Sequence, residues 1–408
     1  HEFYGQNGTY SARLAYSPVN WLTFRGTYGT SFRAPNVREL FLGGQTGFVP
    51  GTADPCIVPL AARQADPNDP LGTPIYDGNN DNRDPQIIAN CQAEGVDPFT
   101  LGLTGSSSIE AFRTGNPGLD PETSTAWSAG FVVSQPWFDS FDVTLGLSYF
   151  KIKVEDSIGL PGAAFGLNQC YSSSDFPNDP FCARRTRDAD SGLLVSVDNT
   201  PFNVARSELS GVDLNGRFST DIDAFGGMQF AMSTVWTWSE EILNQTTPQS
   251  NVTNVVGRWG NPEWRGNVSA RLTRGDWSGF WRMRYIGSQA SQYTDTSAGS
   301  DFPYGQRQHP ACGTLDVGCF QTNDPSTAFV DFSSYVTSAP STMYHDLSLT
   351  YSADTWVLRG GVNNVFNQNP AVVSGNATGA QLGRANAVLG SGYDLIGRSF
   401  FLNVTKSF

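Results

Sequence analysis

Residues 140–156 read SFDVTLGLSYFKIKVED, and apolar and polar side chains alternate along them. The apolar side chains are Phe141, Val143, Leu145, Leu147 and Tyr149, and the polar positions between them are Asp142, Thr144, Gly146 and Ser148. Successive side chains of a β-strand point to opposite faces, so this period of two residues predicts a strand with one apolar and one polar face. We find no helical period of comparable length in the sequence.

The same alternation recurs from one end of the chain to the other. We predict eleven strands, over residues 9–17, 21–32, 123–134, 140–156, 207–219, 227–240, 265–273, 277–288, 342–352, 355–366 and 398–408. Short turns lie near residues 17–20, 135–139, 221–226, 274–277 and 352–354, and they alternate with long segments at 33–122, 157–206, 241–264, 289–341 and 367–397. An antiparallel sheet with short turns at one end and long loops at the other is typical of outer-membrane barrels.

The two faces of these strands also differ in the way that the faces of a membrane barrel do. The apolar face is rich in Leu, Phe, Trp and Tyr, whereas the opposite face carries Arg, Asp, Ser, Thr and Gly and suits a hydrated lumen. Aromatic residues near the strand ends are typical of interfacial girdles, and they are Trp21, Trp137, Phe138, Trp238, Trp277 and Trp356. The sequence therefore predicts an all-β chain in which residues 1–408 form one transmembrane antiparallel β-barrel domain.

The composition excludes several other classes of protein. The 408 residues carry a formal net charge of −13, and nucleic-acid binding needs a basic face, so we do not expect a nucleic acid as a partner. No stretch approaches the roughly 18 apolar residues that a transmembrane helix needs. Aromatic residues make up 12% of the chain. A disordered chain has too few such residues to bury a core, so we do not expect the chain to be disordered.

Six cysteines fall into three local pairs, which are Cys56 with Cys91, Cys170 with Cys182, and Cys312 with Cys319. Each pair lies within one polar segment, so three local disulfides are the simplest interpretation, although six cysteines allow other connectivities. Lasting disulfides need an oxidising compartment such as the periplasm or the cell surface. The first residues, HEFYGQNGTY, lack the basic and apolar regions of a signal peptide, so we expect a mature or truncated product.

The last predicted strand ends on Phe408. Its sequence, SFFLNVTKSF, alternates apolar and polar residues, and Lys406 is the single break on the apolar face. An alternating strand that ends on an aromatic residue resembles the recognition end of bacterial outer-membrane proteins, so Phe408 is a candidate signal for the barrel-assembly machinery. If the carboxy terminus lies on the short-turn side, an odd number of strands places the amino terminus on the long-loop side. Bacterial single-chain barrels have an even number of strands, so we expect the chain to be the carboxy-terminal part of something larger.

Five longer motifs point to a family. They are FRGTYGTSFRAPNVRELF (24–41), GNPGLDPETSTAWSAGF (115–131), ARSELSGVDLNGRF (205–218), LRGGVNNVFNQNPAVV (358–373) and YDLIGRSFFLNVTKSF (393–408). In this order they resemble the barrel of TonB-dependent outer-membrane receptors, and the resemblance reaches across the whole chain. It implies a barrel of about 22 strands with an amino-terminal plug inside, of which these residues would be the carboxy-terminal half.

The resemblance also implies a function. Members of this family take up scarce nutrients such as siderophores, vitamins or glycans, and the TonB–ExbB–ExbD system drives them through a plug that is missing from these residues. The implied location is the outer membrane, in contact with lipid, with the long loops extracellular and the carboxy terminus periplasmic. The alternative is a passive porin, or a structural or surface-binding barrel, without energy coupling.

The longest connection, residues 33–122, holds twelve acidic residues and five arginines. We interpret it as a solvated loop. Within it Asp77, Asn79, Asp81 and Asp84 place oxygen atoms at a spacing that suits Ca²⁺. The rest of an EF-hand pattern is missing, so this segment is a candidate calcium site and no other cofactor is predicted.

Five arginines are predicted to face the lumen, namely Arg25, Arg217, Arg282, Arg284 and Arg359. They either line a path for a ligand or pair with carboxylates, which belong to the plug or are Asp213 and other acidic residues of the wall. No enzyme is predicted, because the sequence has no G-x-S-x-G motif. His345 and Asp346 are neighbours on a predicted strand and face opposite sides, so they form no catalytic dyad.

Overall fold

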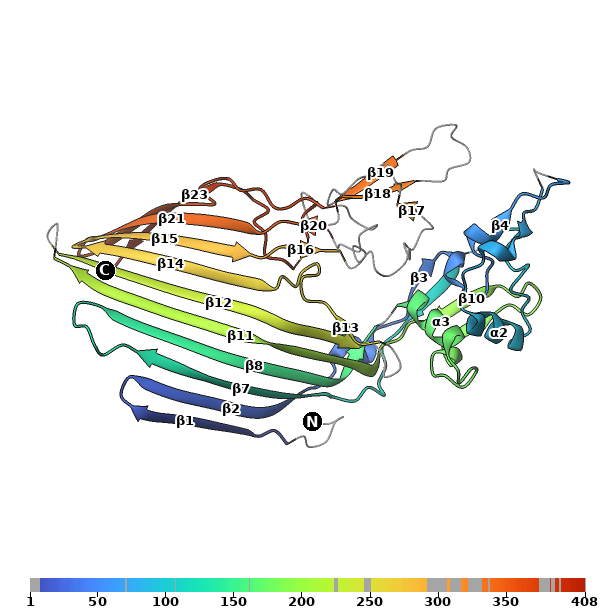
Figure 1. Cartoon of the computed structure of the whole chain (residues 1–408), viewed down its shortest axis with the longest axis horizontal. Coiled ribbons are helices and arrows are strands. Elements are labelled where there is room, and N and C mark those ends of the chain that lie inside the picture. Colours follow the sequence, from blue (N-terminus) through green and yellow to red (C-terminus); the bar gives the residue numbers. More distant parts are fainter. Residues whose placement is uncertain are drawn as a thin grey trace.

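A computed structural model of the chain describes residues 8–69, 72–106, 108–160, 162–223, 227–245, 251–291, 307–308, 317–321, 332–336, 338–373, 382, 386–388 and 390–407. Its main element is one antiparallel sheet in which each strand pairs with the next one along the path (Figure 1). The strands of this path are β1 (Ser11–Val19), β2 (Leu22–Arg33), β7 (Glu122–Ser134), β8 (Asp142–Gly159), β11 (Phe202–Ile222), β12 (Met228–Gln245), β14 (Trp264–Arg274), β15 (Trp277–Ile286), β21 (Thr342–Ser352), β22 (Trp356–Asn363) and β23 (Ser399–Lys406). The eleven predicted strands are therefore confirmed, and β13 (Thr253–Asn254) adds a short twelfth strand beside β12.

The connections lie where the alternation of lengths predicts them. In Figure 1 the short turns gather at one end of the sheet, together with the carboxy terminus, and the long connections gather at the other end. Among the described residues, no helix has both the length and the apolar character that crossing a bilayer requires.

Faces of the sheet follow from the strand register, because residues paired across antiparallel strands share a face. Leu214 of β11 pairs with Leu147 of β8 on one side and with Trp236 of β12 on the other. This face is called the apolar face. The residues between them, such as Asp213 and Asn215, lie on the opposite, polar face. The prediction of one apolar and one polar face is confirmed for these strands.

Aromatic residues border an apolar band of this face on two sides. Ring contacts on the short-turn side join Trp21 to Trp137 at 5.3 Å and Trp277 to Tyr351 at 4.8 Å, and those on the long-loop side join Trp127 to Tyr149 at 5.2 Å and Trp238 to Trp264 at 6.4 Å. Along β15, Trp277 and Tyr285 are separated by a rise of about 27 Å, at ~3.4 Å per residue. A membrane barrel has an apolar band of about 25 Å between its aromatic girdles, so the spacing fits a bilayer.

Beyond this band, on the long-loop side, the alternation of apolar and polar residues changes phase, so apolar side chains lie on the opposite face of the strand. In β8 the apolar face carries Leu145, Leu147 and Tyr149, but the next residues on it are Lys151 and Lys153. Phe150, Ile152 and Val154 are apolar and lie on the polar face instead. The phase change explains why β11 and β12 are longer than predicted, since a strand whose apolar side changes no longer shows a constant alternation.

Lys406, the break in the last strand, lies opposite Trp356 on the apolar face. Its ammonium nitrogen is 4.9 Å from the centre of the Trp356 ring, which is a cation–π contact. Trp356 stands at the short-turn end of β22, where an amphipathic ring and a lysine both suit an interface. The charge is therefore compatible with an otherwise apolar face.

Two long connections fold together into a small globular unit at the long-loop end (Figure 1). We call residues 45–113 and 162–199 the loop module. Its main sheet runs β3 (Gln45–Val49), β6 (Ile109–Arg113), β10 (Leu194–Asp198), β9 (Arg185–Arg187), and its helices are α2 (Pro85–Ala93) and α3 (Ala163–Ser172). A pair of two-residue strands, β4 (Arg63–Gln64) and β5 (Ile75–Tyr76), and several 3-10 turns complete it. The two connections share one apolar core that includes both Leu101 and Leu167.

The remaining elements belong to the other connections. The short helix α1 (Val37–Phe41) follows β2 and is capped by Asn36, whose side chain accepts a hydrogen bond from the Glu39 amide. Short strand pairs are β16 (Gln289–Ala290) with β20 (Ser338–Ala339), and β18 (Val317–Gln321) with β17 (Arg307–Gln308) and β19 (Phe332–Val336). A second apolar cluster, which includes Ile286 and Tyr344, lies at the long-loop end of β15 and β21.

Gly130 is a sensitive position in the sheet. A Cβ atom there would lie 2.2 Å from the Leu147 carbonyl oxygen and 2.6 Å from Ser148 Oγ, so the backbone would have to move. We expect Gly130→Ala to destabilise the folded sheet by about 1–3 kcal/mol. The measurement is the temperature at which the folded, fast-migrating form is lost on a detergent gel.

Gly26→Ala is the matched control for this change. Gly26 is on the apolar face of the neighbouring strand, and its added Cβ would have the Ser128 carbonyl oxygen, at 3.7 Å, as its nearest contact. We expect this variant to unfold at the wild-type temperature. Equal losses in the two variants would show that the packing at Gly130 is not the cause.

Candidate ligand-binding face

The register places all five predicted arginines on the polar face. One row runs Thr144, Arg217, Ser233, Ser269, Arg282, Asp346 across six strands. Another runs Arg25, Gly130, Ser148, Asp213, Thr237, Arg265. Arg284 is two residues from Arg282, and Arg359 pairs with Thr350, which is on the same face. The strands thus bring together side chains that are far apart in sequence.

Contacts divide these arginines into two groups. Arg282 forms an ion pair with Asp346 at 2.6 Å, and Arg284 lies 3.9 Å from the same carboxylate and over the ring of Tyr344. Pairing with a wall acid, one of the predicted alternatives, therefore applies to this group. Asp346 also accepts a hydrogen bond from the backbone amide of Asn364, which ends β22 with a positive φ of 51°.

The other three predicted arginines form no ion pair within the part of the chain that the structure describes. Arg25 donates to Ser148 Oγ at 3.0 Å across the space that Gly130 leaves open, and Arg359 donates to Ser348 Oγ at 3.4 Å. Asp213, the partner considered from the sequence, instead accepts a hydrogen bond from Thr237 Oγ1 at 2.6 Å. Arg359 also lies over the ring of Phe401, 5.6 Å from its centre. No carboxylate of the described residues therefore neutralises Arg25, Arg217 or Arg359.

Four further arginines on this face were not predicted, and they are Arg13, Arg33, Arg265 and Arg271. Arg33 forms ion pairs with Glu39 and Glu122. Arg265 donates to the Gly260 carbonyl at 2.7 Å, and Arg271 donates to Ser278 Oγ at 3.2 Å. The sequence could have placed Arg265 and Arg271 on this face, because they are separated from the polar residues Asn267 and Ser269 by an even number of positions on the predicted strand 265–273.

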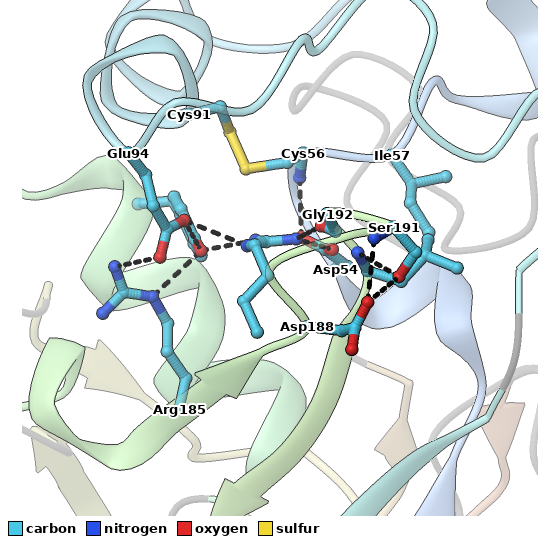
Figure 2. Close-up of polar contacts among 12 residues, drawn as sticks. Asp54, Cys56, Ile57, Cys91, Glu94, Arg185, Asp188, Ser191 and Gly192 are labelled. Atoms are coloured by element: carbon cyan, nitrogen blue, oxygen red, sulfur yellow. Dashed lines mark hydrogen bonds and ion pairs between the residues drawn. A yellow bond between two sulfur atoms is a disulfide. The ribbon is translucent and has the colours of Figure 1, made fainter.

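The loop module contains a buried charged cluster that joins its two connections. Arg187 makes a double contact with Asp54, at 2.7 and 3.1 Å, and also approaches Glu94 at 3.1 Å. Arg185 pairs with Glu94 at 2.8 Å, and the Tyr171 hydroxyl donates to Glu94. Figure 2 shows that the Cys56–Cys91 disulfide lies beside this cluster. The interpretation of residues 33–122 as a solvated loop is wrong here, because the Asp54 side chain is 1% exposed.

Burial and charge shift two pKa values in this cluster. Burial raises the pKa of Tyr171 to about 12, and the positive charge of Arg187 opposes that shift. Burial alone would lower the pKa of Arg187, but its hydrogen bonds and its attraction to Asp54 outweigh burial and raise it. The cluster is thus held together by a neutral phenol and a permanently charged guanidinium.

The Tyr171 phenol gives a pH-dependent contribution to the stability of the loop module. Its pKa is raised from 10.0 in the unfolded chain, so the contribution is fully present below pH 10 and is lost as the pH rises through about 12. The loss is on the order of 2–3 kcal/mol. We expect the difference in phenolate absorbance between wild type and Tyr171→Phe to titrate near pH 12.

A midpoint near the ordinary pKa would contradict this prediction, because it would mean that the phenol is solvated. Tyr76 serves as the internal comparison. Its hydroxyl donates to Asp81 at 2.9 Å, and burial raises its pKa as well. Tyr76→Phe removes another phenol of the same module and should leave the titration near pH 12 in place.

The four candidate calcium ligands have other partners. Asp81 pairs with Arg83 at 2.6 Å, Asp77 accepts from the Asn79 amide, and Asp84 caps α2 by accepting from the Gln86 amide. Burial raises the pKa of Asp81, but its hydrogen bonds with Arg83 outweigh burial and lower it. Within the described ranges, no three acidic, histidine or cysteine side chains gather as a metal site. Asp77, Asp81 and Asp84 are therefore not gathered as a metal site, Asn79 contacts Asp77 through its backbone amide, and calcium stays a prediction.

Two of the three predicted disulfides are present. Cys56 is bonded to Cys91 and Cys170 to Cys182, and all four sulfurs lie in the core of the loop module. The prediction of Cys312 with Cys319 falls outside the described side chains, and so does the predicted assembly signal at Phe408.

Comparison with known proteins agrees with this geometry. The sequence profile described as TonB dependent receptor-like, beta-barrel matches residues 2–365. The chain belongs to the TonB-dependent receptor β-barrel family. Receptors of this family are outer-membrane proteins and not enzymes, which agrees with the prediction of a non-enzyme. A comparison with curated proteins finds no match.

Solved structures share the fold of this receptor chain. A variant of the ferric enterobactin receptor PfeA from Pseudomonas aeruginosa is similar over 100% of this chain and 41% of its own, with 15% identity and a TM-score of 0.53. Another PfeA variant, in complex with enterobactin, gives 16% identity, 100% and 42% coverage and a TM-score of 0.53. The siderophore receptor PirA from Acinetobacter baumannii is 14% identical over 100% of this chain and 42% of its own, with a TM-score of 0.49. The chain therefore spans less than half the length of these receptors.

Proposed function

We propose that this chain forms part of the barrel of an outer-membrane receptor that takes up a small anionic nutrient in a TonB-dependent manner. The observation that carries the proposal is the charge of the polar face. Its arginines are Arg13, Arg25, Arg33, Arg217, Arg265, Arg271, Arg282, Arg284 and Arg359, and its carboxylates are Glu122, Asp142, Asp213, Asp221 and Asp346. The face is thus basic in a chain of net charge −13.

This distribution supports an anionic substrate. Charge of one sign along a confined wall raises the local concentration of ions of the opposite sign. Three of the arginines without ion pairs, Arg25, Arg217 and Arg359, lie on separate strands and at different depths of the face. Siderophores, vitamins and glycans are the candidate nutrients, and anionic ones among them suit this face.

The proposed orientation has the loop module outside the cell and the carboxy terminus in the periplasm. It rests on the gathering of short turns and carboxy terminus at one end of the sheet (Figure 1) and on the general arrangement of outer-membrane barrels. Lipid would cover the apolar face, and the barrel-assembly machinery would recognise the carboxy-terminal strand. The TonB–ExbB–ExbD system would act through a plug that residues 1–408 do not supply.

The test is uptake by cells that express the full-length protein. We expect growth on a panel of ferric chelates, vitamins and oligosaccharides to depend on this receptor for at least one anionic member. That growth should disappear when TonB is deleted or a protonophore is added. Uptake that persists under both conditions would indicate a passive porin and overturn the proposal.

A paired variant tests the role of the basic face in the same assay. Arg217→Gln removes an arginine without an ion pair in the described structure, whereas Arg38→Gln removes an exposed arginine of the short helix α1 and should leave uptake unchanged. If the polar face binds the nutrient, Arg217→Gln should raise the concentration needed for half-maximal uptake while the amount of folded receptor stays unchanged. An unchanged concentration dependence would remove this face from the proposal.

A further inference from the structure

The phase change in β8 places an apolar stripe on the polar face. Ile152 pairs with Leu209 of β11, and Leu209 pairs with Ile242 of β12, so the three side chains form one row. Phe150 and Val154 flank Ile152 on the same face. We call these five residues the inner stripe.

Described parts of the loops do not cover the inner stripe. None of its members belongs to either of the two apolar clusters of the described residues, or to the side chains packed against those clusters. Ile152 is 36% exposed, and the other four side chains are half-buried. The opposite face of the same segment carries Lys151 and Glu208, which form an ion pair, so it is not a lipid-covered face. A strand segment with this pattern lies beyond the membrane band, with its apolar side turned to the polar face.

Charged groups lie on the same face as the stripe, nearer to the short turns. The row that contains Arg25 and Asp213 is two rows away from Ile152, which is about 14 Å at ~6.8 Å for each pair of residues. Arg217 is four residues beyond Asp213 on the same strand, towards the short turns. The two arginines have no ion pair in the part of the chain described here, and Arg25 is held in place by Ser148.

We propose that the inner stripe binds the apolar part of an amphiphilic anion, whose charged group reaches Arg25. This inference rests on the proposed function and deepens it, since it gives the nutrient an apolar group as well as a negative charge. Complementarity of charge selects the occupant, because a wholly apolar partner would leave the arginine side unmatched and a simple anion would leave the stripe in water.

The test uses dansyl-aspartate as a probe on the full-length receptor in lipid nanodiscs. The probe joins an apolar ring system to two carboxylates, and its emission reports transfer out of water. Dansylamide keeps the ring without the charge, and N-acetyl-aspartate keeps the charge without the ring. We expect saturable binding of dansyl-aspartate, weaker binding of dansylamide, and no competition by N-acetyl-aspartate at equal concentration.

Adjacent residues of β12 provide matched variants. Ile242→Ser removes a member of the stripe, and Leu243→Ser makes the same kind of change on the opposite face. Ile242→Ser should weaken probe binding by about tenfold or more, whereas Leu243→Ser should leave it unchanged. Arg25→Gln should weaken the binding of dansyl-aspartate and leave the binding of dansylamide unchanged.

Several results would overturn the inference. They are equal affinities for dansyl-aspartate and dansylamide, equal effects of the two β12 variants, or a loss of loop stability in Ile242→Ser with unchanged probe affinity, which would show a packing surface. The proposed function is tested separately by TonB-dependent growth. If growth depends on TonB but the probe does not discriminate, only this inference fails; if the probe discriminates but uptake is passive, only the energy coupling fails.

Discussion

Asp54→Asn is expected to open the loop module of a receptor whose main sheet remains folded. Asp54 accepts two hydrogen bonds from Arg187 and one from the Cys56 amide, and the side chains of the ion pair are 1% and 8% exposed. The amide of asparagine would direct a donor at the guanidinium, which would stay buried with its charge only partly compensated by Glu94. Breaking a buried pair in this way costs about 3–5 kcal/mol.

Limited proteolysis of the intact receptor measures this effect. Cleavage of a transiently open segment follows its open population, so we expect cleavage within residues 45–113 and 162–199 to accelerate by a factor on the order of 10² to 10³. The temperature at which the folded, fast-migrating form is lost on a detergent gel reports on the main sheet, and it should stay at the wild-type value. The two readouts together separate the module from the sheet.

Asp190→Asn is the control for this experiment. Asp190 is an exposed residue of the same module, and it makes the same change of carboxylate to amide without a buried partner. It should leave the cleavage rate at the wild-type value. If Asp54→Asn behaves like Asp190→Asn, the cluster around Arg187 does not hold the module together.

Removing the Cys56–Cys91 disulfide is the second change for which we expect a large effect. The bond joins residues 35 apart, both fully buried, and links the segment after β3 to helix α2. Closing a loop of this length restricts the unfolded chain by on the order of 4 kcal/mol in the chain-entropy description. Cys56→Ala with Cys91→Ala should therefore unfold the module at a temperature at which wild type is folded.

The second disulfide supplies a graded comparison. Cys170 and Cys182 are 12 residues apart, so the same description gives about 3 kcal/mol for Cys170→Ala with Cys182→Ala. Proteolysis with and without a reductant should show the longer loop to be the more sensitive, and the reductant should reproduce both variants. A larger effect for the shorter loop would mean that the local packing around the sulfurs decides the stability.

Both predictions concern the loop module, which is stabilised by other interactions than the barrel wall. The wall is held by backbone pairing between neighbouring strands along the whole path of eleven strands. The loop module instead depends on one shared core, two disulfides and one charged cluster. Substitutions in the module should therefore change the long-loop end of the chain, while the wall stays assembled.

The amino-acid sequence by itself determined the eleven strands of the main sheet and, within the membrane band, which of its two faces is apolar. Arg217 could be assigned to the polar face from its own neighbours, because alternation is a local property with a period of two residues. The pairing of Cys170 with Cys182 was accessible for the same reason, since both lie in one short segment. Arg265 and Arg271 could have been found in the same way.

Tertiary structure alone decided the contacts between distant segments. Asp54 and Arg187 are 133 residues apart, and nothing in either segment indicates that they meet in a common core. The inner stripe depends on the register that aligns Ile152, Leu209 and Ile242, and one residue of shift would turn a strand's side chains to the other face. Periodicity reports which way a side chain points, whereas its partner is set by the packing of the whole chain.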